Sequence, residues 1–110
     1  MPVNEQMERK QMMAVKVMIN RKVSKEKARR MIPLFREMRS FAIHRKGYVS
    51  GETLRDLNDP DNFLVISTWL SSKDWETWLV NKKRQKIRRK MDELLGGKTE
   101  YSVFHHGFTE

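Results

Sequence analysis

The sequence predicts an α+β fold with the ferredoxin-like order β-α-β-β-α-β and an antiparallel sheet. Three observations support this prediction. Residues 48–55 and 62–70 read as two strands, and the turn between them is rich in Asn, Asp and Pro. A segment with apolar residues spaced three and four apart precedes these strands, and a second such segment follows them. One further strand is predicted at each end of the domain, which completes the order.

The length of the chain, 110 residues, allows one domain with a modest core. Hydrophobic residues make up 38% and charged residues 34%, a balance typical of globular proteins. We expect residues 1–12 to form a flexible tail, because they are polar, and residues 13–107 to form the domain. The first eleven residues lack the apolar segment of a secretory signal.

Cysteine is absent, which excludes disulfides, thiolate catalysis and cysteine-ligated metals. No apolar run approaches the roughly 18 residues that span a bilayer, so the sequence predicts no membrane partner. Cytoplasm is the expected location. The net charge of +9 favours anionic partners such as an acidic metabolite, nucleic acid or the propionates of haem, although solubility alone also accounts for it.

The first predicted strand covers residues 14–22, where every second residue is apolar. Ser24 is suited to cap the helix that follows. Pro33 is expected to kink this helix, and Gly47 to end it. The apolar stripe of the helix consists of Ala28, Met31, Ile32, Phe35, Met38 and Ala42.

The strand at residues 62–70 is apolar on both sides. One side carries Phe63, Val65 and Trp69, and the other carries Leu64, Ile66 and Leu70. A strand of this kind is central and covered on both faces. Because the helices of this fold cover one face of the sheet, we expect a second subunit to cover the other, which makes the protein a homodimer. In the preceding strand, Gly51 predicts a bulge or a close backbone approach.

The second helical segment is expected to begin at Ser71 or Ser72. Its apolar phase is interrupted near residues 81–84, which predicts a break there. The stripe resumes at Ile87, Met91, Leu94 and Leu95. Gly96 is suited to stop the helix, and a last strand is predicted over residues 100–106.

Three segments carry a resemblance to a known family. They are Gly-Tyr-Val-Ser-Gly-Glu at 47–52, Val-Ile-Ser-Thr-Trp at 65–69 and Ser-Lys-Asp-Trp-Glu-Thr-Trp at 72–78. In this order they resemble the antibiotic biosynthesis monooxygenase (ABM) domain, over residues 13–106. The resemblance implies a dimeric α+β barrel in which two sheets pack face to face. It also implies a small monooxygenase that acts on a planar aromatic molecule, a phenol or quinol, without metal or organic cofactor.

Related haem-degrading monooxygenases use an asparagine late in the first strand, a tryptophan in the helix after the third strand, and an axial histidine further along. Asn20 and Trp78 match the first two positions, so the resemblance implies catalytic roles for both. Arg88 stands where the histidine is expected, and a guanidinium has no lone pair for iron. Haem therefore stays an alternative that Arg88 disfavours.

Substrate binding is predicted for Arg84, Arg88 and Trp75. The two arginines lie at the edge of a basic helical face and would hold an anionic group. Trp78 would form an apolar wall, and Asn20 would supply a hydrogen bond. Each residue also has a structural interpretation, because tryptophans commonly fill a core and strand-end asparagines commonly bond to nearby backbone.

Residues 82–90 hold seven basic residues in nine, on the pattern of a solvated amphipathic helix. The same run would serve as a phosphate-binding stripe. The aromatic residues that accompany basic ones in single-strand binding proteins are missing from it, so nucleic acid is ranked last among the partners.

No metal site is predicted. His105 and His106 point to opposite faces of a strand, and neither they nor His44 belong to a spacing typical of metal ligands. These histidines would ligate haem only with a geometry unlike that of the family. A non-enzymatic small-molecule-binding or regulatory dimer remains the alternative to an enzyme.

Overall fold

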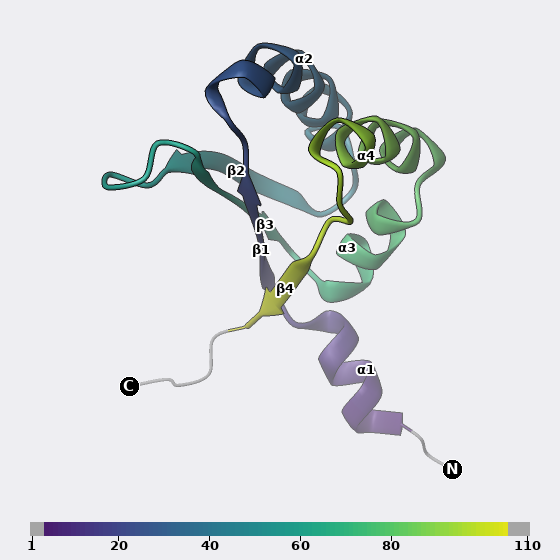
Figure 1. Ribbon diagram of the computed structural model, residues 1–110. Coiled ribbons are helices and arrows are strands. Elements are labelled where there is room, and N and C mark those ends of the chain that lie inside the picture. The colour runs from purple at the N-terminus through teal and green to yellow at the C-terminus, as the bar shows by residue number, and fades with distance from the viewer. Residues whose placement is uncertain (1–3, 106–110) are drawn as a thin grey trace.

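The computed structural model describes residues 4–105. Its elements are α1 (Asn4–Met12), β1 (Val15–Lys22), α2 (Lys25–Ala42), β2 (Tyr48–Arg55), β3 (Asn62–Trp69), α3 (Ser72–Leu79), α4 (Lys82–Leu95) and β4 (Tyr101–Phe104). The four strands form one sheet in the order β2-β3-β1-β4, and all neighbouring strands are antiparallel. Helices α2, α3 and α4 lie on one side of the sheet (Figure 1). The predicted ferredoxin-like α+β fold is therefore confirmed.

The strand register separates the sheet into two faces. Val15 pairs with Trp69, and Val17 with Ser67, so the odd-numbered residues of β1 and β3 share the face that the helices cover. Val15, Val17 and Trp69 are buried there. The opposite face carries Met18, Leu64 and Ile66, which are half-buried, and Leu54 and Phe104, which are exposed. This apolar face is the surface on which a second subunit is predicted.

Helix α2 begins where the sequence predicts. The Oγ atom of Ser24 accepts a hydrogen bond from the backbone N–H of Lys27, at 3.4 Å. The helix then runs without interruption through Pro33. It ends at Ala42, five residues earlier than the predicted stop at Gly47, and a turn fills the gap.

Gly47 ends this turn in a conformation that only glycine adopts easily. Its φ is +83°, and a Cβ atom would lie 2.2 Å from Oδ2 of Asp74. Gly47→Ala is therefore expected to lower the free energy of unfolding by about 2–3 kcal/mol, measured by urea denaturation. Gly97→Ala is the control, because no atom lies within 4 Å of its added Cβ. Equal losses in the two variants would contradict this role of Gly47.

The predicted break in the second helical segment is also present. Helix α3 ends at Leu79, and Asn81 caps α4 by accepting hydrogen bonds from the N–H groups of Lys83 and Arg84, at 2.9 and 3.2 Å. Gly96 ends α4 with a left-handed φ of +73°. The break sets the direction of α4, and it thereby decides which side chains of α4 reach the sheet.

Helices and sheet enclose two neighbouring apolar clusters. The first contains Val15, Val17, Ala42, Trp69, Trp75 and Trp78. The second contains Val23, Met31, Ile87 and Met91. Met38 and Phe41 of α2 pack against both clusters, so α2 connects the aromatic part of the core to its aliphatic part.

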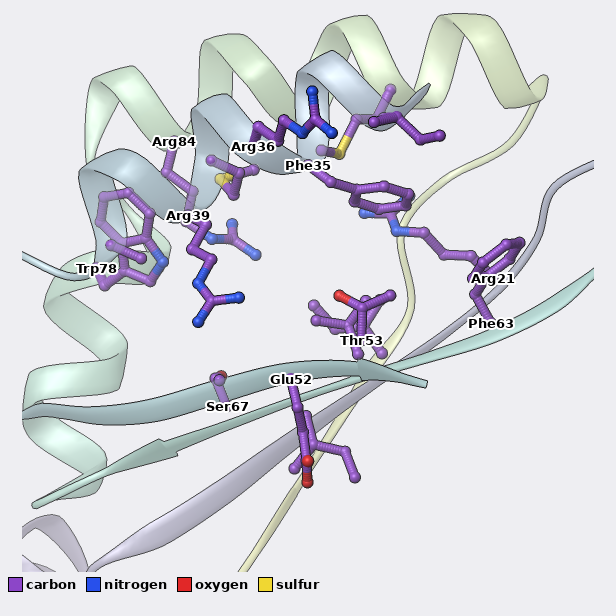
Figure 2. A pocket seen from close by; sticks show the side chains of 18 of the residues that line it. Arg21, Phe35, Arg36, Arg39, Glu52, Thr53, Phe63, Ser67, Trp78 and Arg84 are labelled. Atoms are coloured by element: carbon purple, nitrogen blue, oxygen red, sulfur yellow. The ribbon is translucent and has the colours of Figure 1, made fainter. Parts of the chain in front are cut away.

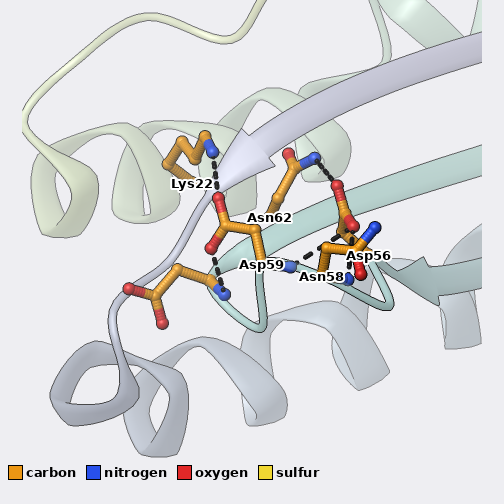
Figure 3. Close-up of polar contacts among 6 residues, drawn as sticks. Lys22, Asp56, Asn58, Asp59 and Asn62 are labelled. Atoms are coloured by element: carbon orange, nitrogen blue, oxygen red, sulfur yellow. Dashed lines mark hydrogen bonds and ion pairs between the residues drawn. The ribbon is translucent and has the colours of Figure 1, made fainter.

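The turn between β2 and β3 is held by its own polar side chains (Figure 3). Asp56 accepts hydrogen bonds from the N–H groups of Asn58 and Asp59, at 2.8 and 3.3 Å, and from the side-chain amide of Asn62 at 3.0 Å. Lys22 pairs with Asp59. These contacts explain why Asn and Asp follow β2.

The two ends of the chain differ from the sequence prediction. Residues 4–12, assigned to a flexible tail, form helix α1 instead. Ser72 holds this end in place, because its Oγ donates to the carbonyl of Lys10 and its N–H to the carbonyl of Met13, at 2.8 and 2.9 Å. Strand β4 is shorter than predicted, and His106 lies outside the described residues. No helix within residues 4–105 combines the length and the apolar character needed to cross a bilayer.

Candidate functional site

A cavity of about 320 Å³ lies between the sheet and the helices. Its walls come from β1, α2, β2, β3, α3 and α4 (Figure 2). Most of its lining is apolar, including Ile19, Ile32, Phe35, Phe63, Val65 and Trp69. A volume of this size accommodates a small organic ligand.

Tryptophans form one end of the cavity. Trp69 is completely buried and stacks on Trp78, with ring centroids 6.4 Å apart and an angle of 26° between the rings. The rings of Trp75 and Tyr48 also contact the indole of Trp69, with centroid separations of 6.0 and 5.4 Å. The Nε1–H of Trp69 donates to Ser67 Oγ at 3.0 Å. These contacts fix a flat aromatic wall, to which the predicted site residues Trp75 and Trp78 both belong.

Arg84 brings a positive charge into this apolar space. Its residue is only 3% exposed, and its guanidinium lies 5.2 Å from the ring centroid of Trp75. One Nη1–H donates to the carbonyl of Leu79 at 3.3 Å. No ion pair joins Arg84 to a carboxylate among the described residues. Burial, reinforced by the positive charge of Arg88, lowers the pKa of Arg84 to about 10, so the side chain remains a cation at pH 7.

Two neighbouring arginines, Arg21 and Arg88, share a carboxylate. Arg88 donates to Asp92 Oδ2 at 3.0 Å, and Arg21 lies 3.8 Å from Asp92 Oδ1. Thr99 connects them, because it accepts from Arg21 at 2.9 Å and donates to Asp92 at 2.6 Å. Burial lowers the pKa of Arg21, and the charge of Asp92 opposes this shift. Asp92 therefore neutralises part of the charge of Arg21 and Arg88 and leaves Arg84 uncompensated.

The cavity has an excess of positive charge at its edges as well. Figure 2 shows the side chains of Arg39 and Arg84 extending into the same space. Arg36 and Arg55 also border the cavity. Among the described residues, Glu52 is the only acidic one in the lining, and its carboxylate lies below the sheet in Figure 2. This charge distribution favours a ligand with an apolar body and an anionic group.

Two of the predicted site residues do not line this cavity. Asn20 is exposed, because strand alternation turns it to the face opposite its buried neighbour Arg21. Arg88 is turned toward Asp92. The catalytic role of Asn20 and the substrate-binding role of Arg88 stay predictions.

Sequence reasoning missed several polar residues of the cavity, namely Arg21, Arg36, Arg39, Thr53 and Ser67. The signal for Arg21 was available, because it continues the buried odd-numbered series of β1. The signal for Arg39 was weaker, because its position on α2 only borders the apolar stripe. Neither His44 nor His105 is among the residues that line the cavity. Within the described part of the chain, no group of His, Cys, Asp and Glu is arranged to hold a metal ion.

Comparison with known proteins decides the family. The family model described as antibiotic biosynthesis monooxygenase matches residues 14–90, well over half of the chain. The chain belongs to the ABM family. This confirms the resemblance inferred from the segments around the two central strands and the helix that follows them.

Solved structures share the ABM fold. A conserved protein from Methanosarcina mazei Go1 is 16% identical, with a TM-score of 0.78 over 90% of this chain and 98% of its own. A variant of SnoaB, a cofactor-independent oxygenase from Streptomyces nogalater, is 17% identical, with a TM-score of 0.76 over 87% of this chain and 95% of its own. At such identities the likeness shows the fold alone. No curated protein sequence matches the chain.

Proposed function

We propose that this ABM protein is a cofactor-independent monooxygenase that oxygenates a planar phenol or quinol in the cavity between sheet and helices. The observation that supports this most is Arg84, an uncompensated cation against the aromatic wall of an apolar cavity. Family membership supports the reaction type, and SnoaB, which shares the fold, is described as a cofactor-independent oxygenase.

The proposed chemistry requires little from the protein. A deprotonated phenol or quinol is itself a reductant for dioxygen. Oxidation of a ring carbon of a phenol to a quinone carbonyl balances. One atom of dioxygen enters the substrate as the carbonyl, and the other leaves as water with the hydrogens of the ring C–H and the phenol O–H. Arg84 would stabilise the substrate anion, and Trp75 and Trp78 would hold the ring plane and exclude water. In this proposal Arg84 takes the anion-binding role that sequence reasoning divided between Arg84 and Arg88.

We further propose that the protein is a homodimer formed through the open face of the sheet. The apolar residues Met18, Leu64 and Ile66 lie on this face, and the barrel implied by the family resemblance pairs two such faces. A single chain leaves these side chains partly in contact with water, which a second sheet would exclude.

The proposed activity is tested by oxygen uptake with a panel of polycyclic phenols and quinols, in the presence of a chelator and without added cofactor. We expect uptake that depends on both protein and substrate, with one equivalent of oxygen consumed per product. Saturable binding of the same compounds without oxygen uptake would instead support the non-enzymatic binding dimer. In the same assay, no change in affinity or turnover for Asn20→Ala would remove Asn20 from the site.

A further inference from the structure

The net charge of the protein is concentrated on two helices. Helix α2 contains six basic and two acidic residues, and α4 contains seven and two, so they carry net charges of +4 and +5. The remaining ten basic and ten acidic residues of the chain cancel. The total of +9 therefore belongs entirely to α2 and α4.

The fold joins these helices into one basic surface. Helices α2 and α4 pack side by side on the same side of the sheet (Figure 1). Lys83, in the first turn of α4, lies over the ring of Phe41, in the last turn of α2, with Nζ 4.8 Å from the centroid. Eleven of the thirteen basic residues of the two helices are exposed. We call this surface, formed by the exposed residues of α2 and α4 that do not line the cavity, the basic helical layer.

The basic helical layer has the chemistry of a phosphate-binding surface with nothing to insert into a membrane. Helices that lie on a bilayer bury an apolar face among the lipid chains. Here the apolar faces of α2 and α4 are used in the core, where Met31, Ile87 and Met91 are buried. Ile32 is the only large hydrophobic residue in the two helices that is exposed. The basic helical layer can therefore attract phosphate groups by its charge, but it has no apolar face to insert into a bilayer.

The composition of the layer also favours a duplex over a single strand. Proteins that bind single strands stack bases on exposed aromatic rings. Phe35 and Phe41 are the only aromatic residues of α2 and α4, and both are half-buried in the core. Ser40 is the only hydroxyl residue in the two helices, and its Oγ donates to the carbonyl of Glu37. The layer therefore lacks the exposed aromatic rings on which the bases of a single strand would stack.

We propose that the basic helical layer binds the phosphate backbone of double-stranded DNA without sequence specificity. The 14 residues of α4 extend over about 21 Å, a length along which B-DNA presents about twelve phosphate charges. Sequence reasoning ranked nucleic acid last because residues 82–90 lack the aromatic residues that accompany basic ones in single-strand binding proteins. The basic residues of α2 become relevant only when the fold places them beside α4. This proposal is independent of the chemistry in the cavity.

The test is fluorescence anisotropy of a labelled DNA duplex titrated with the full chain at several salt concentrations. We expect the affinity to fall by at least about tenfold between about 50 mM and about 200 mM salt. The variant K27Q/R29Q/R30Q neutralises exposed residues of α2 that do not line the cavity. It is expected to weaken binding by at least about tenfold. The slope of the logarithm of the binding constant against the logarithm of the salt concentration is expected to become less steep by up to about three. The variant K86Q/R89Q/K90Q of α4 is expected to behave alike.

The matched control is K46Q/K73Q/K98Q, which removes the same charge from exposed lysines outside the layer. It is expected to change the affinity by less than about twofold, and circular dichroism checks that all three variants fold. Equal weakening by the control would show that only overall charge matters and would overturn the proposed surface. The proposal is also overturned by an absence of DNA binding, or by tighter binding to duplex RNA or anionic vesicles.

Discussion

Arg84→Met is expected to weaken the binding of an anionic aromatic ligand by at least about 100-fold, while the fold remains at least as stable as that of the original protein. The two effects have one cause. A buried cation without a carboxylate partner destabilises the folded state, and it binds an anion tightly for the same reason. Arg84 is buried and has a backbone carbonyl and an indole as its contacts, but no ion pair.

The magnitudes follow from the loss of the charge. A hydrogen bond to a charged group contributes about 1.5–3 kcal/mol, and 1.4 kcal/mol corresponds to a factor of ten in affinity. Two such bonds to one anionic group account for a 100-fold loss or more. Replacing a buried charge by an apolar side chain of similar length is often neutral, or stabilising by about 1–4 kcal/mol. We therefore expect Arg84→Met to raise the melting temperature or leave it unchanged.

The measurement compares tryptophan fluorescence on titration with a naphthalene carboxylate and with the corresponding carboxamide. The original protein is expected to prefer the carboxylate, and Arg84→Met to bind both equally. Arg89→Met is the matched control, because Arg89 is exposed on the same helix and does not line the cavity. If Arg84→Met lowered the melting temperature but the folded variant kept the preference for the carboxylate, Arg84 would have a structural role only.

The pH dependence gives an independent check on Arg84. Because its pKa is lowered to about 10, affinity for the carboxylate is expected to be constant between about pH 6 and pH 9 and to weaken above about pH 10. The lowered pKa means that the folded state binds this proton less tightly than the unfolded chain does. Its unfavourable contribution to stability is therefore complete below pH 10 and is relieved as the pH rises toward the ordinary arginine value. Arg84→Met is expected to lose both dependences.

The sequence was sufficient for the fold because local and long-range signals agree in it. The alternation in β1 predicts the buried face, and its pairing with β3 confirms it, as the pair Val17 and Ser67 shows. The break before α4 was visible in the apolar phase, and Asn81 supplies the cap. Helix α1 was missed because Ser72, which holds it, lies about 60 residues away in the sequence.

The candidate site was only partly predictable. Trp75, Trp78 and Arg84, three of the predicted site residues, line the cavity, because helical spacing places the tryptophans on the buried face and Arg84 at its edge. The sequence could not distinguish Arg84 from Arg88, which are one helical turn apart. The distinction depends on Asp92, which lies one further turn along α4 and pairs with Arg88. Tertiary contacts of this kind decide which cation remains unpaired.

Asp92→Asn is expected to lower the free energy of unfolding by about 3 kcal/mol. Its side chain is 17% exposed. Its carboxylate forms ion pairs with Arg21 and Arg88 and also acts on the charge of Arg84. Removing one partner from a buried ion pair leaves the other charge uncompensated, which costs about 3–5 kcal/mol when burial is complete. For a domain of this size, 3 kcal/mol corresponds to a decrease of about 10 °C or more in the melting temperature.

Urea denaturation of Asp92→Asn, Arg21→Met and the double variant measures the coupling. We expect the double variant to be more stable than Asp92→Asn, because it no longer contains an unpaired Arg21. Asp61→Asn is the control, since Asp61 is an exposed carboxylate of the β2–β3 turn and is expected to change stability by less than about 0.5 kcal/mol. Additive losses in the double variant would show that Asp92 does not act through Arg21.

Ligand binding by Asp92→Asn separates its effect on the fold from its effect on the cavity. Arg21 lines the cavity, and without Asp92 its full charge would add to that of Arg84. The less stable variant is therefore expected to bind a naphthalene carboxylate more tightly than the original protein, at a temperature where both are folded. Weaker binding would mean that Asp92 mainly keeps the cavity walls in place. Asp92→Asn is thus expected to lose stability and gain affinity, whereas Arg84→Met is expected to lose affinity without losing stability. Together these results would show that the Asp92 carboxylate, which Arg21 and Arg88 share, sets the charge of the cavity.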